Sequence, residues 1–565
     1  MTARAAQAAW RPPRLKTPDA LHVVLATVGA NLLSLALPIL TLQIYDRILP
    51  NPESGTLPVL IAGVTAAVAL EAALKIARAY MIGWNGATYE YAVSTAAMRH
   101  VLGADIPQIR AAGIGEHLHS MAAIGKTKDF HDGQALSALV DTLFVLVYAG
   151  FIFYVAGRLG AVPMALLGLF AVISFVEGRC LRRRLQARET VDDRRYDFLI
   201  ESLNAIHTVK SFAAENVLRR RYEELQKESV AANYDVAGAT AAIFNTGTVM
   251  AHAIAAATIT AGALLIFDGG VTTGALIATL LLSGRMMQSV QRGLVLWVRY
   301  QDYRISRARV AGIFALPAAE RLPAAPSPTP QTGVLEVKGL SYGFGAGAPP
   351  LFRDVEFTLK PGDAMLLKGD YAAGKSTLLN LIAGVFPPSS GTVAADGRDI
   401  RAFAPGELAR HAGYISNDPV IFRGTIRDNV TRFGEIGEAA ARGAAAALGV
   451  DRDVARMPSG FDTVIYGNSS DAIPPGLKQR IAMARVVAAG PRIILFDEAD
   501  QCLDREGLKN VLRLLARLRE TCALVIVTED PDIAALATCE GTLVNGVFTF
   551  RKGVRHDAAG QKRST

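Results

Sequence analysis

The chain has 565 residues, of which 51% are hydrophobic and only 19% charged, and its formal net charge is +8. Soluble domains usually carry about a quarter charged residues, so this composition excludes a wholly soluble protein and indicates a membrane region. The positive charge does not indicate nucleic-acid binding, because many basic residues flank long apolar runs, as Arg182, Arg183 and Arg184 do.

The first 315 residues contain six apolar runs, and a membrane-spanning helix needs about 20 such residues. The segments after the second and fourth runs are long and basic, which predicts that they and both termini face the cytoplasm. We therefore expect a short cytoplasmic segment (1–20) and then a six-helix α-helical transmembrane domain (21–315). The predicted spans are 22–44, 57–76, 136–156, 161–176, 236–267 and 274–298.

Two arginines, Arg285 and Arg292, interrupt the sixth run. They are seven residues apart and therefore share one face of a helix. Charge inside a membrane is costly and usually faces a cavity or a partner. One interpretation is a basic lining for a polypeptide path. The other places Arg292 near the cytosol and pairs Arg285 with an acid on a neighbouring helix.

After the apolar half comes a proline-rich stretch, LPAAERLPAAPSPTPQ, which predicts a linker over 316–333. The segments LEVKGLSYGF and VEFTLKPGDAMLLKG then read as strands, followed by a helix and by further strand–helix alternation. This order predicts an α/β P-loop nucleotide-binding domain with a parallel sheet over 334–552. A basic tail (553–565) ends the chain.

The strongest motif is GDYAAGKS, which lies between the apolar strand AMLL and the helical run TLLNLIAG. In this context the pattern predicts a loop whose backbone N–H groups hold the phosphates of ATP. Lys375 would reach the terminal phosphates and Ser376 would hold Mg²⁺. The expected binding residues are Gly369, Asp370, Tyr371, Ala372, Ala373, Gly374, Lys375, Ser376 and Thr377.

A second motif, RIILFDEAD, places two carboxylates at the end of an apolar strand about 120 residues later. Asp497 is suited to binding Mg²⁺, and Glu498 is suited to polarising an attacking water. ATP and Mg²⁺ are therefore the expected cofactors. The alternative is a strand that simply ends in solvated acids.

With these motifs, residues 334 to about 550 resemble the ATPases of ABC transporters. DPVIFRGTIRDNV is similar to the region of the Q-loop, with Asn417 at the glutamine position. KQRIAMARVVAAGPRIILFDEA is similar to the signature helix and Walker B, and CLD to the D-loop, with Asp504 as its aspartate. The resemblance implies that Phe344, or less favourably Tyr342, stacks on adenine.

The membrane half resembles the permeases of type I secretion ABC exporters, in LALPILTLQIYDRILPN and LLSGRMMQSV above all. SLNAIHTVKSFAAEN is similar to the second cytoplasmic loop of exporters, so we expect residues 204–214 to dock on a cassette. The resemblance implies a half-transporter in the lipid of the bacterial inner membrane. It also implies a second ABC subunit, a periplasmic adaptor and an outer-membrane channel as partners.

Three positions depart from the family pattern. The signature reads IPPGL, in which Pro474 and Pro475 have no N–H and Leu477 has no polar group, so Gly476 alone matches the family. The switch histidine is replaced by Glu529, whose charge would repel a phosphate. The Q-loop glutamine is replaced by the shorter Asn417.

These departures predict weak hydrolysis by this chain alone and a heterodimer with a catalytically intact partner. The leading hypothesis for function is ATP-driven type I secretion of a polypeptide. The same architecture also suits an exporter of lipid or another small amphiphile. A third hypothesis is a regulatory subunit that binds ATP with little hydrolysis of its own.

Overall fold

The computed structural model describes residues 17–51, 55–318, 322, 332–344, 349–466 and 473–553. The chain divides into two compact units, one of Met1–Ala104 with Gln108–Ala318, the other of Asp105–Pro107 with Ala319–Thr565. All the elements described in the first unit are helices, and the second unit is built on a large sheet. Most of the predicted N-terminal segment, of the linker and of the basic tail lies outside the described residues.

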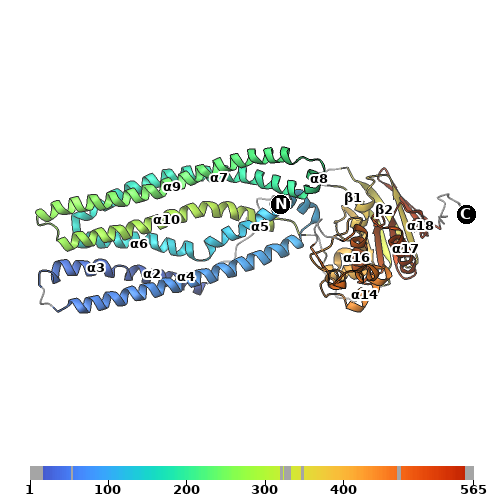
Figure 1. The fold of residues 1–565 in the computed structure, drawn as a ribbon, viewed down its shortest axis with the longest axis horizontal. Helices are drawn as coiled ribbons and strands as arrows, with labels where there is room; N and C mark the ends of the chain where they lie inside the picture. The colour runs from blue at the N-terminus through green and yellow to red at the C-terminus, as the bar shows by residue number, and fades with distance from the viewer. Residues whose placement is uncertain are drawn as a thin grey trace. The chain divides into compact units, whose positions relative to one another are not determined.

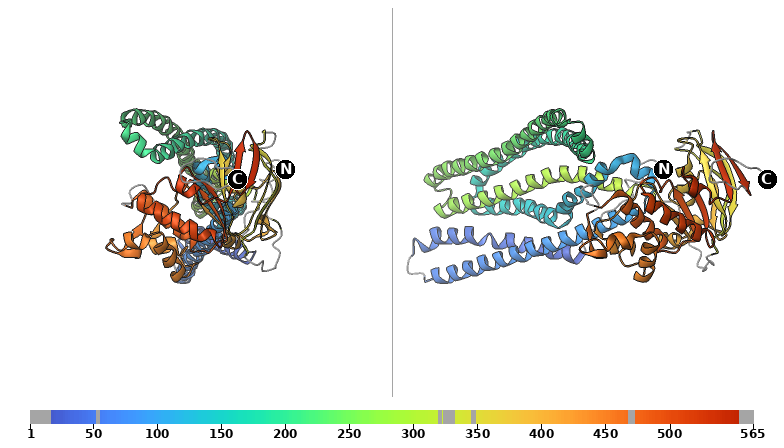
Figure 2. Two further views of the ribbon diagram at one scale, coloured as in Figure 1. Left: turned by 90° about the vertical axis from the view of Figure 1, so that its right-hand side faces the viewer. Right: turned by 45° about the vertical axis from the view of Figure 1, so that its right-hand side comes forward.

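Long helices lie side by side along most of the first unit, with α7 against α9 and α10 against α6 (Figure 1, Figure 2). Every predicted span falls within these helices. Their bounds are α2 (Thr17–Leu33), α3 (Ala36–Gln43), η1 (Ile44–Ile48), α4 (Leu57–Leu102), α5 (Ile106–His131), α6 (Gln134–Ala156), η3 (Gly157–Gly160), α7 (Ala161–Asn204), α8 (Ile206–Ser211), α9 (Glu215–Phe267) and α10 (Thr273–Phe314).

The first predicted span is divided between α2 and α3. Pro38 lies in the first turn of α3 and cannot donate to the carbonyl of Ser34, four residues earlier, so a continuous helix is interrupted here. In the same turn, the hydroxyl of Ser34 donates to the carbonyl of Asn31 at 2.7 Å. The span is therefore a helix with a break near its middle.

Four helical stretches of the described chain are long and apolar enough to cross a membrane: Pro18–Ile48, Leu57–Leu102, Gly115–Asn204 and Glu215–Phe267. The third stretch contains both α6 and α7, and hence two predicted spans. The sixth predicted span lies in α10, which is not among the four; Arg285 and Arg292 lower its hydropathy. At 1.5 Å per residue, the 46 residues of α4 extend about 70 Å, well beyond a hydrocarbon core of about 30 Å.

A buried ion pair joins α10 to α6 inside this unit. Arg292 donates to Asp141 at 2.7 Å, and Asn31 of α2 donates to the other carboxylate oxygen at 2.7 Å. The Asp141 side chain is buried, whereas Arg292 remains partly exposed. Of the two arginines that interrupt the sixth run, Arg292 rather than Arg285 therefore has an acidic partner among the residues that the structure describes.

The second unit contains a ten-stranded mixed sheet with the order β5-β4-β1-β2-β12-β11-β3-β10-β9-β6. Its strands are β1 (Leu335–Tyr342), β2 (Phe352–Leu359), β3 (Ala364–Gly369), β4 (Ser390–Ala395), β5 (Arg398–Asp399), β6 (Ala412–Ile415), β9 (Ile493–Asp497), β10 (Ala523–Val527), β11 (Cys539–Val544) and β12 (Val547–Lys552). A separate pair is formed by β7 (Gly424–Thr425) and β8 (Val464–Ile465).

The prediction of a parallel sheet is correct for one part of this sheet and wrong for the other. Strands β11, β3, β10, β9 and β6 run parallel, whereas β2, β1, β4 and β5 pair antiparallel. The length of the connections explains two of these antiparallel pairs. Nine residues separate β1 from β2 and two separate β4 from β5, whereas parallel neighbours need a crossover of about a dozen or more residues.

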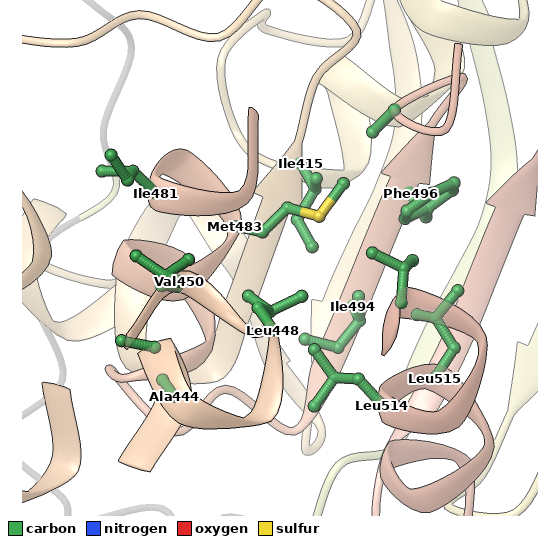
Figure 3. Packing of buried hydrophobic residues seen from close by; sticks show 14 of the residues in the cluster. Ile415, Ala444, Leu448, Val450, Ile481, Met483, Ile494, Phe496, Leu514 and Leu515 are labelled. Carbon is green, nitrogen blue, oxygen red and sulfur yellow. The ribbon is translucent and has the colours of Figure 1, made fainter. Parts of the chain in front are cut away.

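Helices cover the parallel strands and bury a large apolar core (Figure 3). In this core Met483 of α16 lies beside Ile415 of the sheet, and Leu515 of α17 packs near Phe496 in the same cluster. The phosphate-binding motif lies where this sheet meets its first helix. The helices of the unit are α11 (Lys375–Ile382), η4 (Ile400–Ala402), α12 (Pro405–His411), α13 (Ile426–Val430), α14 (Glu438–Ala447), α15 (Val450–Val454), η5 (Gly460–Asp462), α16 (Pro475–Val487), α17 (Arg505–Arg519) and α18 (Pro531–Ala534).

Candidate nucleotide site

The predicted phosphate loop connects the end of β3 at Gly369 to the start of α11 at Lys375. Gly374 precedes the helix with φ of 100°, a conformation that favours glycine. A Cβ at Gly369 would lie 2.5 Å from the carbonyl oxygen of Leu543, so a larger residue does not fit there either. The two glycines of the motif are therefore required by the backbone itself.

Lys375 folds back over this loop. Its ammonium donates to the carbonyl of Gly369 at 2.9 Å and to that of Asp370 at 3.4 Å. The side chain of Tyr371, in the same loop, is 100% exposed. The charge of Lys375 thus lies beside the loop whose N–H groups would hold phosphate oxygens.

Asp497 ends β9 and is almost fully buried, with both carboxylate oxygens accepting hydrogen bonds. Ser376 donates to one at 3.1 Å, and the hydroxyl of Tyr414 on β6 donates to the other at 2.7 Å. A hydroxyl and a carboxylate side by side are oxygen ligands of the kind Mg²⁺ prefers, so these two predicted residues fit the ion. The sequence analysis missed Tyr414, because nothing near it in the sequence indicates its partner.

Glu498 follows Asp497 in a left-handed backbone conformation, with φ of 49°, and its N–H donates to the carbonyl of Val527 at 2.9 Å. Gln501 donates to the Glu498 carboxylate at 2.9 Å. Asn417 in turn donates to the Gln501 carbonyl at 3.2 Å. The structure thus brings two of the predicted residues together through a third, Gln501, which the sequence analysis did not identify.

The replaced switch residue Glu529 is exposed and follows β10 by two positions. Beside it, Thr528 donates to Asp500 at 2.7 Å. Burial raises the pKa of Asp500 above its ordinary value, and the nearby carboxylates of Asp530 and Glu529 act in the same direction. Three carboxyl groups, of Asp500, Glu529 and Asp530, therefore lie close together at this edge of the site, where a phosphate would favour positive charge.

Of the two aromatic candidates for adenine, Phe344 has 61% of its side chain exposed and Tyr342 only 5%. The Tyr342 ring stacks on Phe386 within the core, with centroids 5.9 Å apart. A residue already packed in this way has no free face for a base, so the geometry favours Phe344.

The altered signature lies at the start of α16. Pro474 is the N-cap, Pro475 is the first helical residue, and the Leu477 N–H already donates to the carbonyl of Pro474 at 3.0 Å. The side chain of Leu477 is buried in the hydrophobic core, so it is a packing residue rather than one that faces a ligand. Gly476 packs closely on the chain at Cys502, where a Cβ would lie 2.9 Å from the carbonyl oxygen.

Two further residues connect these parts. Asp504, predicted as the D-loop aspartate, caps α17 by accepting the Gly507 N–H at 2.8 Å. Gln479, which the sequence analysis did not single out, is buried in α16 and donates to the carbonyl of Ser416 at 2.8 Å, next to Asn417. The start of the signature helix is thereby tied to the segment that carries Asn417.

Comparison with known proteins agrees with this geometry. Residues 21–290 match the family described as ABC transporter transmembrane region, and residues 352–501 match the family described as ABC transporter. The second match contains the phosphate loop, Asp497 and Glu498.

Among curated proteins, the chain is similar to the cyclolysin secretion/processing ATP-binding protein CyaB of Bordetella pertussis, with 29% identity over 89% of this chain and 70% of that protein. It is 26% identical to the exotoxin translocation ATP-binding protein PaxB of Pasteurella aerogenes, over 90% of this chain and 71% of the relative. It is 25% identical to the alpha-hemolysin translocation ATP-binding protein HlyB of Escherichia coli, over 90% and 72%.

The order of the two matched regions repeats the division of the chain into a helical unit and a sheet unit. The relatives named above share both regions with this chain over most of its length. The chain is therefore a member of the ABC transporter family, an exporter subunit homologous to the ATP-binding permeases of type I secretion.

Proposed function

We propose that this chain is one half of an ATP-driven exporter in the bacterial inner membrane and that it works beside a second ABC subunit with an intact signature. The observation that carries the proposal is the contrast between the two parts of its cassette. Ser376 and Asp497 lie 3.1 Å apart beside a well-formed phosphate loop. The signature helix begins instead with two prolines, which offer no N–H to a phosphate.

The residues divide the chemistry of ATP hydrolysis among them. Lys375 would neutralise charge on the terminal phosphates, and Ser376 with Asp497 would hold Mg²⁺, which would supply Lewis-acid polarisation of the phosphate. Glu498 accepts a proton from the attacking water. Glu529 would oppose this arrangement, because an ionised carboxylate replaces the family's histidine at this sequence position and would repel a phosphate nearby.

A polypeptide is the proposed cargo, because the similar proteins are named for the secretion or translocation of protein toxins. Type I secretion of this kind would also engage a periplasmic adaptor and an outer-membrane channel. The segments after the second and fourth predicted spans and both termini would face the cytoplasm, as the basic residues in these segments indicate.

The short helix α8 is the proposed element of coupling between membrane helices and a cassette. It is only six residues long, and its two flanks carry exposed apolar side chains, Leu203 at 66% and Phe212 at 77% exposure. Exposed apolar groups beside a short helix are typical of a docking element. Deletion of 206–211 should abolish ATP-driven transport while leaving nucleotide binding intact; retained transport would refute this role.

The experiment for the whole proposal begins with purification of the chain from its native membrane and identification of the ABC subunit that comes with it. The chain alone should hydrolyse ATP near background, and co-expression with that subunit should raise the rate. Glu498→Gln in this chain should then lower the rate of the complex again, and it should lower it less than the equivalent change in the partner if the partner's site dominates turnover.

Three other outcomes would contradict the proposal. Rapid turnover by a verified homodimer would show that IPPGL works as a signature. Stimulation by lipid but not by polypeptide would favour an exporter of amphiphiles. ATP binding without any hydrolysis that depends on Glu498, even in the complex, would favour a regulatory subunit.

A further inference from the structure

We propose that Gln501 is a positioning residue for hydrolysis, which orients the Glu498 carboxylate and links it to Asn417. This inference rests on the proposed function of Glu498 in hydrolysis. Three side chains from two separate segments form a continuous series of hydrogen bonds. Asn417 donates to Gln501 at 3.2 Å, and Gln501 donates to Glu498 at 2.9 Å.

The chemistry of the groups sets the direction of this series. An ionised carboxylate only accepts hydrogen bonds, so Gln501 must present its NH₂ group to Glu498. Its carbonyl oxygen is then the acceptor for Asn417, which must present its own NH₂ group. The carbonyl oxygen of Asn417 is consequently not the atom that bonds to Gln501.

The series also explains how a shortened residue can still act at this site. Asn417 is one methylene shorter than the glutamine expected at its position in the family, so it reaches less far. Gln501 extends that reach, because its longer side chain fills the distance between Asn417 and Glu498. Loss of length at one position is thus offset by an amide at another, 84 residues later in the chain.

Both anchors of the series are held by the fold. The segment of Asn417 is fixed by Gln479, which donates to the Ser416 carbonyl at 2.8 Å. Glu498 is fixed through its own N–H, which donates to Val527 at 2.9 Å. A bond from Gln501 to one carboxylate oxygen, Oε2, leaves Oε1 to take the proton of the attacking water. Gln501 therefore sets which oxygen faces the reaction.

The test uses the full-length chain in its native complex, with Gln501→Ala and Gln501→Glu as variants. Glutamate has nearly the size of glutamine but, when ionised, cannot donate to Glu498. Both variants should lower kcat about tenfold and leave the KM for ATP within about twofold, since the loss is in orientation rather than in binding. Lys509→Ala, an exposed position on α17, is the matched control and should leave both constants unchanged.

Two further measurements separate positioning from a general effect on folding. In a double-mutant cycle, Asn417→Ala with Gln501→Ala should be no slower than Gln501→Ala alone, because Asn417 acts on Glu498 only through Gln501. Amide hydrogen exchange around residues 415–420 in the full-length chain should become several-fold faster in Gln501→Ala. The exchange measurement needs no turnover.

Unchanged exchange in this segment, or additive losses in the cycle, would overturn the inference. A different outcome is faster exchange in Gln501→Ala together with an ATPase rate that does not change in Glu498→Gln. It would support the link between Gln501 and Asn417. That result would refute the proposed function of Glu498. The two failures are thus distinguishable.

Discussion

Asp46 ties the end of the first membrane-spanning segment to the start of α10, because its carboxylate accepts the backbone N–H of Gly274 at 2.9 Å. Its other oxygen accepts the hydroxyl of Thr272 at 2.7 Å. Asp46 belongs to the motif IYDRILPN and lies in the π-helical turn η1. A Cβ at residue 274 would overlap the Asp46 carboxylate, which explains the glycine. The motif therefore connects η1 to the start of α10 through hydrogen bonds, although these two helices are far apart in sequence.

We predict that Asp46→Ala lowers the stability of the full-length chain by about 1 kcal/mol, the usual cost of losing a side-chain cap at a helix start. Thermal unfolding in detergent is the measurement. Asp46→Asn keeps an acceptor oxygen and should lose less. Equal losses of stability in the alanine and asparagine variants would show that the connection between η1 and α10 depends on the charge of Asp46 rather than on its hydrogen bonds.

Arg292→Ala should be among the most destabilising changes in the helical unit, by about 3 kcal/mol, because it leaves Asp141 buried without its partner. The value is at the low end for such pairs because Arg292 is partly exposed and water screens it. Asp141→Asn combined with Arg292→Gln should recover most of the loss in the same unfolding assay. A similar loss from Arg285→Ala would mean that the pair has no special importance.

The signature supports a prediction with opposite effects at neighbouring positions. Pro474→Ser with Pro475→Gly should raise ATP hydrolysis by the purified chain alone, because it restores two N–H groups and a hydroxyl at the start of α16. Leu477→Gln should instead destabilise the cassette by about 1–3 kcal/mol, since it buries an amide at a position that is only 3% exposed. Steady-state ATPase and thermal unfolding are the measurements, and no gain from the double substitution would show that the prolines do not limit turnover.

The raised pKa of Asp500 predicts that the stability of the folded chain depends on pH. Burial raises its pKa in the folded chain above the ordinary value of 3.8, so the folded state binds the proton more tightly than the unfolded state. Its contribution is fully present below the unfolded value and is lost as the pH rises through the folded one. Thermal unfolding of wild type and Asp500→Asn should be compared from about pH 4 to about pH 7.5. As the pH rises, the stability of the wild type should fall relative to that of the asparagine variant. A difference that is constant with pH would contradict the raised pKa.

Lys375→Ala should weaken binding of Mg-ATP at least tenfold, because it removes the positive charge held beside the phosphate loop. Titration of the full-length chain with a fluorescent ATP analogue measures the effect. Lys360→Ala, an exposed lysine on the same unit, is the matched control and should bind as wild type does. Equal affinity in the Lys375 variant would mean that the loop does not hold the nucleotide as proposed.

Much of this protein could be predicted from the sequence because the relevant signals are local. An apolar run of about 20 residues indicates a spanning helix wherever it occurs, and each of the six predicted runs is helical in the structure. GDYAAGKS likewise determines part of its own conformation, since residue 374 of the loop has a φ of 100° that favours glycine. The P-loop domain and its residues Lys375, Ser376 and Asp497 follow from such patterns.

Tertiary structure alone decided which distant residues meet. Tyr414 reaches Asp497 because β6 pairs in parallel with β9, in a register that no local pattern predicts. Gln501 joins Asn417 across 84 residues, and Arg292 joins Asp141 across 151. In each case a single side chain is ambiguous by itself, because its partner is chosen by strand register or helix packing. The same packing buried Leu477 and Tyr342, which the sequence could not distinguish from residues that face a ligand.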